Sequence, residues 1–162
     1  MMQIAVTSIW PPEEDAECNN AASSALCVEN GYFKKYVFDV CMATLERGGV
    51  TSKIDTGQFF ASTEAWGMPK YPDRTVILSP GADLEREVTA FIAANEDYLR
   101  RPDCWLGTWI NPDSGNCYLD ITAIYARLED AWHEAIVLSQ NAQRKIVALY
   151  DFKREETVYL AW

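Results

Sequence analysis

Apolar residues recur at helical spacing in three segments of the chain, residues 31–49, 81–101 and 128–141. The first predicted helix ends at Gly48-Gly49, and Pro102 lies just beyond the second. The three apolar faces consist of Phe33, Val37, Val40, Cys41, Thr44 and Leu45, then Leu84, Val88, Phe91 and Ile92, then Leu128, Ala131, Trp132, Ala135 and Ile136. We expect these faces to pack on a common core.

Shorter runs of β-branched and aromatic residues predict strands. They lie in residues 2–9, 50–54, 74–80, 145–152 and 157–162, and residues 103–122 supply two more. The connections at residues 110–116 and 153–157 are as short as hairpin turns, so most strand pairs should be antiparallel. The predicted fold is α+β, with residues 1–162 forming a single domain that has a mostly antiparallel sheet and about three helices.

The segment "DCWLGTWINPDSGNCYLDIT", residues 103–122, predicts a well-formed β-hairpin. Pro112 suits the second position of a type I turn, and Gly115 can adopt the left-handed conformation that a following bulge requires. The same loop faintly resembles a calcium site, but Asn116 and Thr122 stand where that site needs Gly and Glu. The hairpin interpretation is therefore favoured.

The predicted hairpin register determines what the aromatic and cysteine residues contact. A turn centred near Asp113 places Trp109 beside Cys117 and leaves Cys104 too far from Cys117 for a disulfide. On this interpretation Trp109 is a core residue that lies against the third helix, near Trp132.

Two segments show neither helical nor strand periodicity. Residues 10–28, which include "PPEEDAECNN", are predicted to form an acidic, partly mobile loop. Residues 57–73 carry five large apolar residues between glycines and prolines, and they are predicted to form an irregular aromatic loop. This second loop either folds over the core as a lid or exposes Trp66 and Tyr71 as anchors for a partner protein.

Negative charge is concentrated near the start of the chain. The formal net charge is −10, and residues 1–33 contain five acidic residues and no Lys or Arg. This charge argues against direct nucleic-acid binding, because such a surface must be basic. The acidic segment is either a solvated linker or a surface for a basic partner; its candidate partner-binding residues are Glu13, Glu14, Asp15 and Glu17.

The remaining composition indicates a cytoplasmic protein without cofactors. The first residues lack a charged signal-peptide region, and no apolar run approaches the ~18 residues of a membrane span. The five cysteines form no C-x-x-C pair, and His133 is the only histidine, so zinc ligands are scarce. Reduced, mostly buried thiols are expected.

Few residues are candidates for catalysis. A small hydrolase built on Asp113, Asp120 and His133 requires that these side chains converge in a pocket. Asp120 alternates with apolar residues, which is typical of a solvent-side strand residue or a partner for a basic group. Asp151 is a further carboxylate that acid–base catalysis could use.

Part of the sequence resembles a family. The residues concerned are Gly107, Trp109, Gly115, Tyr118, Leu119 and Asp120, followed by Ala131, Ala135, Ile146, Tyr150 and Asp151. They resemble the "G-x-W … G-x-x-YLD" core, helix and closing strand of uncharacterised small acidic proteins encoded by actinobacterial phages and other mobile elements. The resemblance covers residues 70–152. It implies a biological setting and supplies no catalytic residues.

The leading functional hypothesis is a non-enzymatic, acidic protein-binding module. It would act as a phage or mobile-element inhibitor of a host nucleic-acid-directed defence system, of the anti-CRISPR or antirestriction type. An acidic surface can bind the basic groove of a nuclease or effector complex, because complementary charge accelerates association. The alternatives are an accessory or structural module that acts through self-association, and the small hydrolase.

Overall fold

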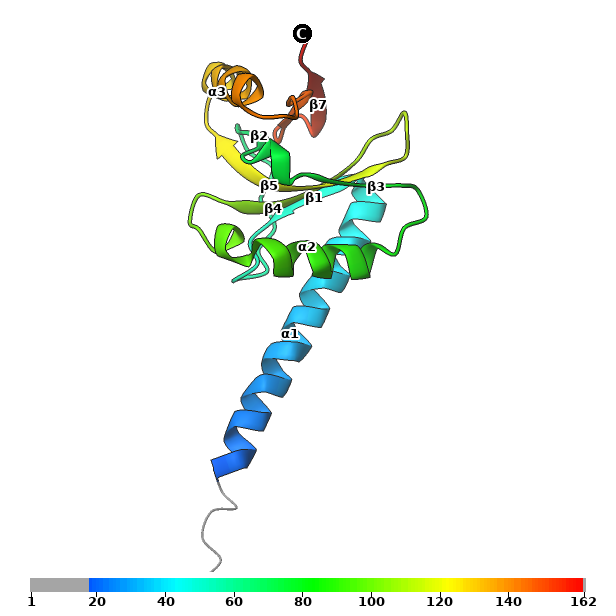
Figure 1. Cartoon of the computed structure of the whole chain (residues 1–162), viewed down its shortest axis with the longest axis vertical. Coiled ribbons are helices and arrows are strands. Elements are labelled where there is room, and N and C mark those ends of the chain that lie inside the picture. Colours follow the sequence, from blue (N-terminus) through cyan, green and yellow to red (C-terminus); the bar gives the residue numbers. More distant parts are fainter. Residues whose placement is uncertain (1–17, 162) are drawn as a thin grey trace, which may run out of the picture. The chain divides into compact units, whose positions relative to one another are not determined.

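A computed structural model describes the backbone of residues 18–161 and the side chains of residues 30–161 (Figure 1). The chain divides into two compact units, Met1–Lys34 and Lys35–Trp162, and the second unit contains the sheet. The strand predicted at residues 2–9 lies outside the described residues. So do four predicted partner-binding residues, Glu13, Glu14, Asp15 and Glu17.

The described residues form helices and one antiparallel sheet, which confirms the predicted α+β fold. The helices are α1 (Cys18–Arg47), α2 (Leu84–Leu99), α3 (Leu128–Asn141) and the 3-10 helix η1 (Pro72–Arg74). The strands are β1 (Gly49–Ser52), β2 (Trp66–Pro69), β3 (Val76–Leu78), β4 (Trp105–Ile110), β5 (Cys117–Tyr125), β6 (Ala148–Asp151) and β7 (Glu156–Tyr159).

The sheet is curled and has β5 near its centre. Its strand order is β1-β4-β5-β2-β6-β7, and β3 pairs separately with β5. β4 pairs along one edge of β5, whereas β3 and β2 share the other edge. β3 pairs as far as Leu119 and β2 begins at Thr122, so Asp120 lies where the second edge changes partner.

One face of this sheet packs against α1 and α2. Leu106, Leu119 and Ile121 are almost completely buried on this face, because alternate residues of a strand point the same way. The hydroxyl groups of Thr44 on α1 and Thr108 on β4 form a buried hydrogen bond of 2.6 Å. Val88 of α2 is also fully buried in this core.

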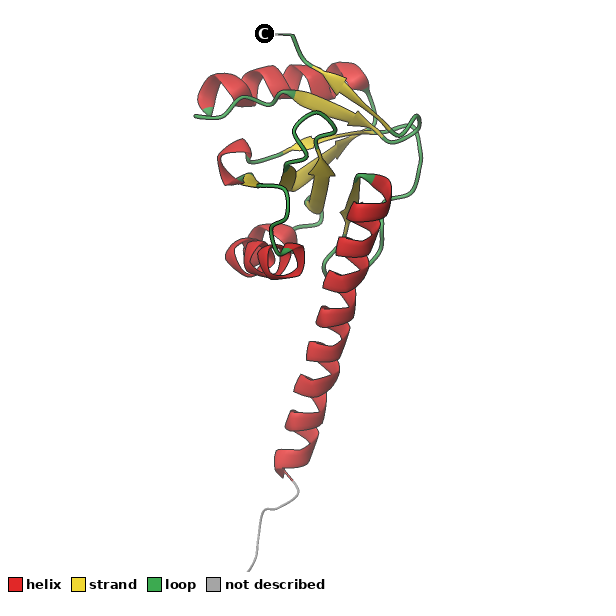
Figure 2. Ribbon diagram, turned by 90° about the vertical axis from the view of Figure 1, so that its right-hand side faces the viewer, coloured by secondary structure: helices red, strands yellow, loops and turns green. Residues whose placement is uncertain are grey.

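The helix α3 packs on the same face of the sheet as α2. Its buried residues Ala131 and Ala135 contact Met68 of β2 and Leu149 of β6. Met68 pairs with Ala123 of β5, which lies on the face of Ile121. Figures 1 and 2 show α2 and α3 at opposite ends of the curled sheet. Because both helices pack on the face that carries Ile121, the opposite face is left without α2 or α3.

Two segments that the sequence predicted as loops are partly regular. Residues 18–28 belong to α1, because alanine and leucine at positions 21, 22, 25 and 26 favour a helix. Residues 66–69 of the predicted aromatic loop form β2, between β5 and β6. The sequence does not predict this strand because Gly67 and Pro69 are unfavourable in strand interiors. Pro69 is the last residue of β2, where a missing N–H is tolerated.

The hairpin of β4 and β5 exists, but its register differs by one residue from the prediction. Trp109 pairs with Tyr118 rather than Cys117. The turn is longer than expected because the N–H of Asn111 donates to the carbonyl of Asn116, with Gly115 left-handed at φ 71°.

Three apolar residues predicted to be core residues are exposed or lie on the other face of the sheet. Trp132 is 37% exposed on α3 and Leu45 is 64% exposed on α1. Trp109 is half-buried on the sheet face opposite α3, where its ring lies near Tyr118 and Tyr159. The prediction that Trp109 packs near Trp132 was therefore wrong, because strand alternation points it away from the helices.

Candidate binding cleft

The sheet face opposite α2 and α3 encloses a cleft of about 740 Å³. Every strand except β3 contributes to its lining, whereas α2 and α3 contribute no residue. Four aromatic side chains from β4, β5, β6 and β7 line the cleft: Trp109, Tyr118, Tyr150 and Tyr159. The curvature of the sheet thus creates a concave surface to which aromatic side chains contribute.

Glycines on this face leave space for the cleft. Gly107 of β4 faces Thr122 of β5, and a Cβ at position 107 would lie 2.0 Å from the Thr122 Oγ1 atom. A Cβ at Gly67 would lie 2.9 Å from the Phe152 ring. Since neither position can hold a side chain without rearrangement, the two glycines allow close approach between elements of the curled sheet.

The aromatic side chains form two groups. The Trp109 ring lies 5.2 Å from that of Tyr118 and 6.4 Å from that of Tyr159, between centroids, so it joins β4, β5 and β7. The Phe152 ring lies 4.5 Å from Phe60 and 5.1 Å from Tyr150. Contacts of this kind stabilise the walls and leave ring faces and edges for a ligand.

Asp120 provides a carboxylate in the cleft. It pairs on β5 with Gly107, which has no side chain to cover it. The Thr75 hydroxyl donates a short hydrogen bond to the Asp120 Oδ1 atom. Burial raises the pKa of Asp120 from its usual 3.8 to about 6, while the Thr75 hydrogen bond and the charge of Arg144 act in the opposite direction.

Arg144 is held next to this carboxylate by the segment that contains η1. The Asp73 Oδ1 atom accepts the backbone N–H groups of Gln143 and Arg144, at 2.9 and 3.1 Å. The Arg144 Nη1 atom donates to the Thr75 carbonyl at 3.2 Å. Thr75 therefore contacts both Asp120 and Arg144, and no direct ion pair between these two described residues is present.

The structure does not bring the predicted hydrolase residues together. Asp113 is exposed in the turn of the β4–β5 hairpin. His133 is exposed on α3, beside Trp132 in a shallow depression. Only Asp120 lines the cleft, so the hydrolase site proposed from the sequence does not form.

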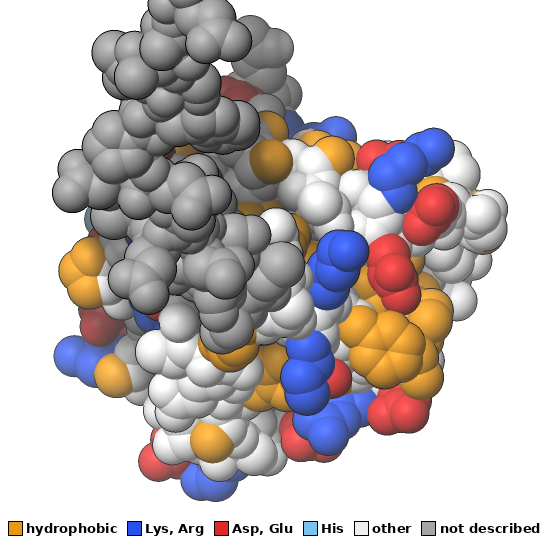
Figure 3. Space-filling model, turned by 90° about the horizontal axis from the view of Figure 1, so that it is seen from below, with side chains coloured by type: hydrophobic (Ala, Val, Ile, Leu, Met, Phe, Trp, Pro, Cys, Tyr) orange, Lys and Arg blue, Asp and Glu red, His pale blue; other side chains and the backbone are white. Residues whose placement is uncertain are grey.

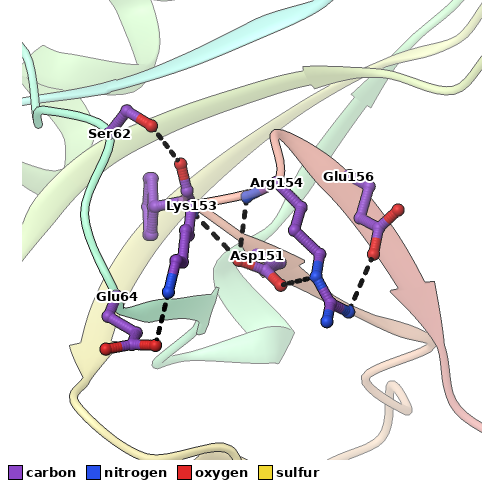
Figure 4. A network of polar contacts seen from close by, with 7 residues as sticks. Ser62, Glu64, Asp151, Lys153, Arg154 and Glu156 are labelled. Carbon is purple, nitrogen blue, oxygen red and sulfur yellow. Dashed lines mark hydrogen bonds and ion pairs between the residues drawn. The ribbon is translucent and has the colours of Figure 1, made fainter.

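Asp151 has a structural role in the β6–β7 turn (Figure 4). Its buried carboxylate accepts the backbone N–H groups of Lys153 and Arg154, at 2.9 and 3.2 Å. Next to it, Lys153 donates to Glu64 at 2.7 Å and Ser62 donates to the Phe152 carbonyl at 2.9 Å. These bonds attach the turn to the segment that precedes β2.

The two predicted anchor residues are both half-buried. Trp66 packs against the α3 core cluster from β2. The Tyr71 ring lies 4.9 Å from Tyr98, and its hydroxyl accepts a hydrogen bond of 2.9 Å from Arg101. Neither lines the cleft, and their role in partner binding stays a prediction.

Charged side chains of both signs alternate on the surface of the second unit. Figure 3 shows Lys and Arg next to Asp and Glu on the face that it presents. Arg86 pairs with Glu87, and Arg100 pairs with Asp55 and Glu96. The composition of residues 1–33, which contain five acidic residues and no Lys or Arg, thus differs from the mixed surface seen here.

Three cysteines, Cys41, Cys104 and Cys117, are buried free thiols. Burial raises the pKa of Cys41 and of Cys117 to about 11. Among residues 30–161, whose side chains are described, no group of three or more His, Cys, Asp or Glu is placed to hold a metal ion. Within the described backbone of residues 18–161, no helix combines the length and the apolar character that a membrane span requires.

For the cleft, the sequence analysis indicates only Asp120, as a solvent-side strand residue or a partner for a basic group. The sequence does not indicate Thr75 or Arg144 as partners of Asp120, because both are distant from it along the chain. They come together because Asp73 binds the backbone next to Arg144.

Comparisons with protein-family models, curated proteins and solved structures find no match for this chain. The site must therefore be interpreted from its own geometry.

Proposed function

We propose that this chain is a binding protein that holds a ligand in the concave cleft. The cleft itself is the observation that carries the proposal. Its volume of about 740 Å³ lies within the range typical of small-molecule sites, and its aromatic walls surround a few polar groups. The helices α2 and α3 and the buried core lie on the other face, so binding need not disturb the core.

We assign the cleft to binding rather than catalysis because of the partners of Asp120. Its pKa of about 6 is suited to proton transfer, but its one direct hydrogen-bond partner is the Thr75 hydroxyl, and Arg144 lies nearby without an ion pair. Neither group can serve as a second acid or base at neutral pH. Asp120 and Arg144 instead offer an acceptor and a donor with which to recognise a ligand.

A fragment screen by NMR tests the binding function. In isotope-labelled protein, aromatic fragments should shift the backbone signals of Gly67 and Gly107 and the Trp109 indole signal. The variant Thr157→Phe should block the effect by filling the cleft, whereas Glu156→Phe, on the opposite face of β7, should not. A screen in which no fragment shifts these signals would contradict the proposal.

The acidic segment supports a second proposal, binding to a basic surface of another protein. The partner would be a host nuclease or effector complex of a defence system, the setting that the resemblance to phage and mobile-element proteins implies. The supporting observation is that residues 1–33 carry half of the net charge of −10. Glu13, Glu14, Asp15 and Glu17 are the residues expected to bind.

Association kinetics with purified CRISPR effectors and restriction enzymes test this second proposal. Neutralising the four residues should slow association and flatten its salt dependence while the fold is retained. A matched control neutralises four acidic residues of α2, Glu85, Glu87, Glu96 and Asp97. Equal effects of the two variants on the association rate would contradict the proposal. So would the finding that the chain binds only metabolic enzymes.

Self-association is supported by an exposed apolar stripe on α1. Phe38, Met42 and Leu45 follow one another at helical spacing and are 51%, 39% and 64% exposed. Adjacent exposed apolar residues are typical of an interaction surface. If copies of the chain associate through this stripe, Leu45→Glu should convert the oligomer to monomer in light scattering, and a monomeric wild type would exclude it.

A further inference from the structure

We propose that the cleft recognises a guanine base, with Asp120 and Arg144 reading its hydrogen-bonding edge and the aromatic walls stacking on its ring. This inference rests on the binding function proposed above and names its ligand class. It follows from three features of the cleft, which are the orientation of the carboxylate, the position of the guanidinium and the balance of charge.

The carboxylate of Asp120 is only partly used by the protein. The Thr75 hydroxyl is its one direct hydrogen-bond partner among the described residues, and it contacts Oδ1. Asp120 is partly exposed, lines the cleft and pairs with Gly107, which has no side chain to cover it, so a ligand in the cleft can contact the carboxylate. A carboxylate binds best to two parallel N–H donors. Guanine presents such a pair, N1–H and the 2-amino group.

The guanidinium of Arg144 supplies the complementary donor. Because Arg144 donates to the Thr75 carbonyl while the Thr75 hydroxyl donates to Asp120, both charged groups lie beside the same residue. Guanine places its O6 acceptor directly next to N1–H, and arginine is a common partner of O6. Adenine has a donor at position 6 and an acceptor at N1, so it fits the pair less well.

The charge of the cleft favours a neutral ligand over an organic cation. Two carboxylates, Asp120 and Glu155, face three cationic side chains, Arg47, Arg144 and Lys145. An organic cation would be attracted to the Asp120 carboxylate but repelled by the Arg144 guanidinium. Trp109, Tyr118, Tyr150 and Tyr159 supply the flat surfaces on which bases stack.

Titration with guanosine tests the inference, with tryptophan fluorescence and NMR as readouts. Guanosine should bind and shift the Trp109 and Gly107 signals, and inosine, which lacks the 2-amino group, should bind about tenfold more weakly. Asp120→Asn and Arg144→Met should each weaken guanosine binding by about tenfold or more. Asp113→Asn, at an exposed turn position, should bind as the wild type does.

The outcomes separate this inference from the binding function. If adenosine binds as tightly as guanosine, or if Asp120→Asn binds guanosine normally, the guanine assignment is wrong. If fragments such as aromatic amines bind in the cleft and guanosine does not, the assignment fails and the binding function stands. If no fragment and no nucleoside binds, both proposals fail.

Discussion

Replacing Asp120 by Asn should stabilise the protein at neutral pH and have little effect in acid. The pKa of Asp120 is raised from 3.8 to about 6 in the folded state, mainly by burial. Below both pKa values the carboxyl group is protonated in the folded and the unfolded protein, so its ionisation does not change the free energy of unfolding. Between these values the unfolded chain releases the proton while the folded protein retains it, and folding becomes less favourable as the pH rises.

An increase in pKa from 3.8 to about 6 corresponds to about 3 kcal/mol of unfolding free energy above pH 6. This is an upper limit, because the carboxylate faces a cleft that water can enter. Asn keeps the acceptor for the Thr75 hydroxyl without the charge. Asp120→Asn should therefore exceed the wild type in stability by about 1–3 kcal/mol at about pH 7, and by much less at about pH 4.

Urea denaturation of both proteins at a series of pH values measures this difference. The matched control is Asp113→Asn, whose carboxyl group is exposed in the hairpin turn. A stability difference that does not change between about pH 4 and pH 7 would refute the argument. So would an Asp120→Asn variant that is less stable than the wild type at neutral pH.

Three other predictions follow from local geometry. Gly107→Ala should cost about 3 kcal/mol in urea denaturation, and Thr122→Ala in the same chain should recover most of it by removing the atom 2.0 Å from the new Cβ. Glu155 has a left-handed φ of 55°, so Glu155→Gly should raise the melting temperature and Glu155→Val should lower it. With pKa values raised to about 11, Cys41 and Cys117 should resist iodoacetamide at about pH 8 until urea unfolds the chain, as peptide mapping would show.

The regular parts of the fold were predictable because their signals are local. The spacing of Val88, Phe91 and Ile92 identifies α2 without knowledge of its neighbours. β2 was missed because its four residues, WGMP, have no alternating pattern of their own. That strand is determined by its two neighbours, β5 and β6, which are distant in sequence.

The cleft was harder to predict because it depends on which way each strand residue faces. An error of one residue in the hairpin register was enough to misplace Trp109, which was expected in the core and lines the cleft instead. The partners of Asp120 come from positions 75 and 144, and nothing near Asp120 in the sequence indicates them.

The alternation along β5 has a consequence for mutational scanning. Leu119, Ile121 and Ala123 face the helices and are buried, whereas Tyr118, Asp120 and Thr122 line the cleft. A scan of abundance and a scan of ligand binding over this strand should therefore both show a period of two residues, and the two profiles should be out of phase. Substitutions that adapt the cleft to a new ligand can accumulate at every second position while the intervening residues preserve folding.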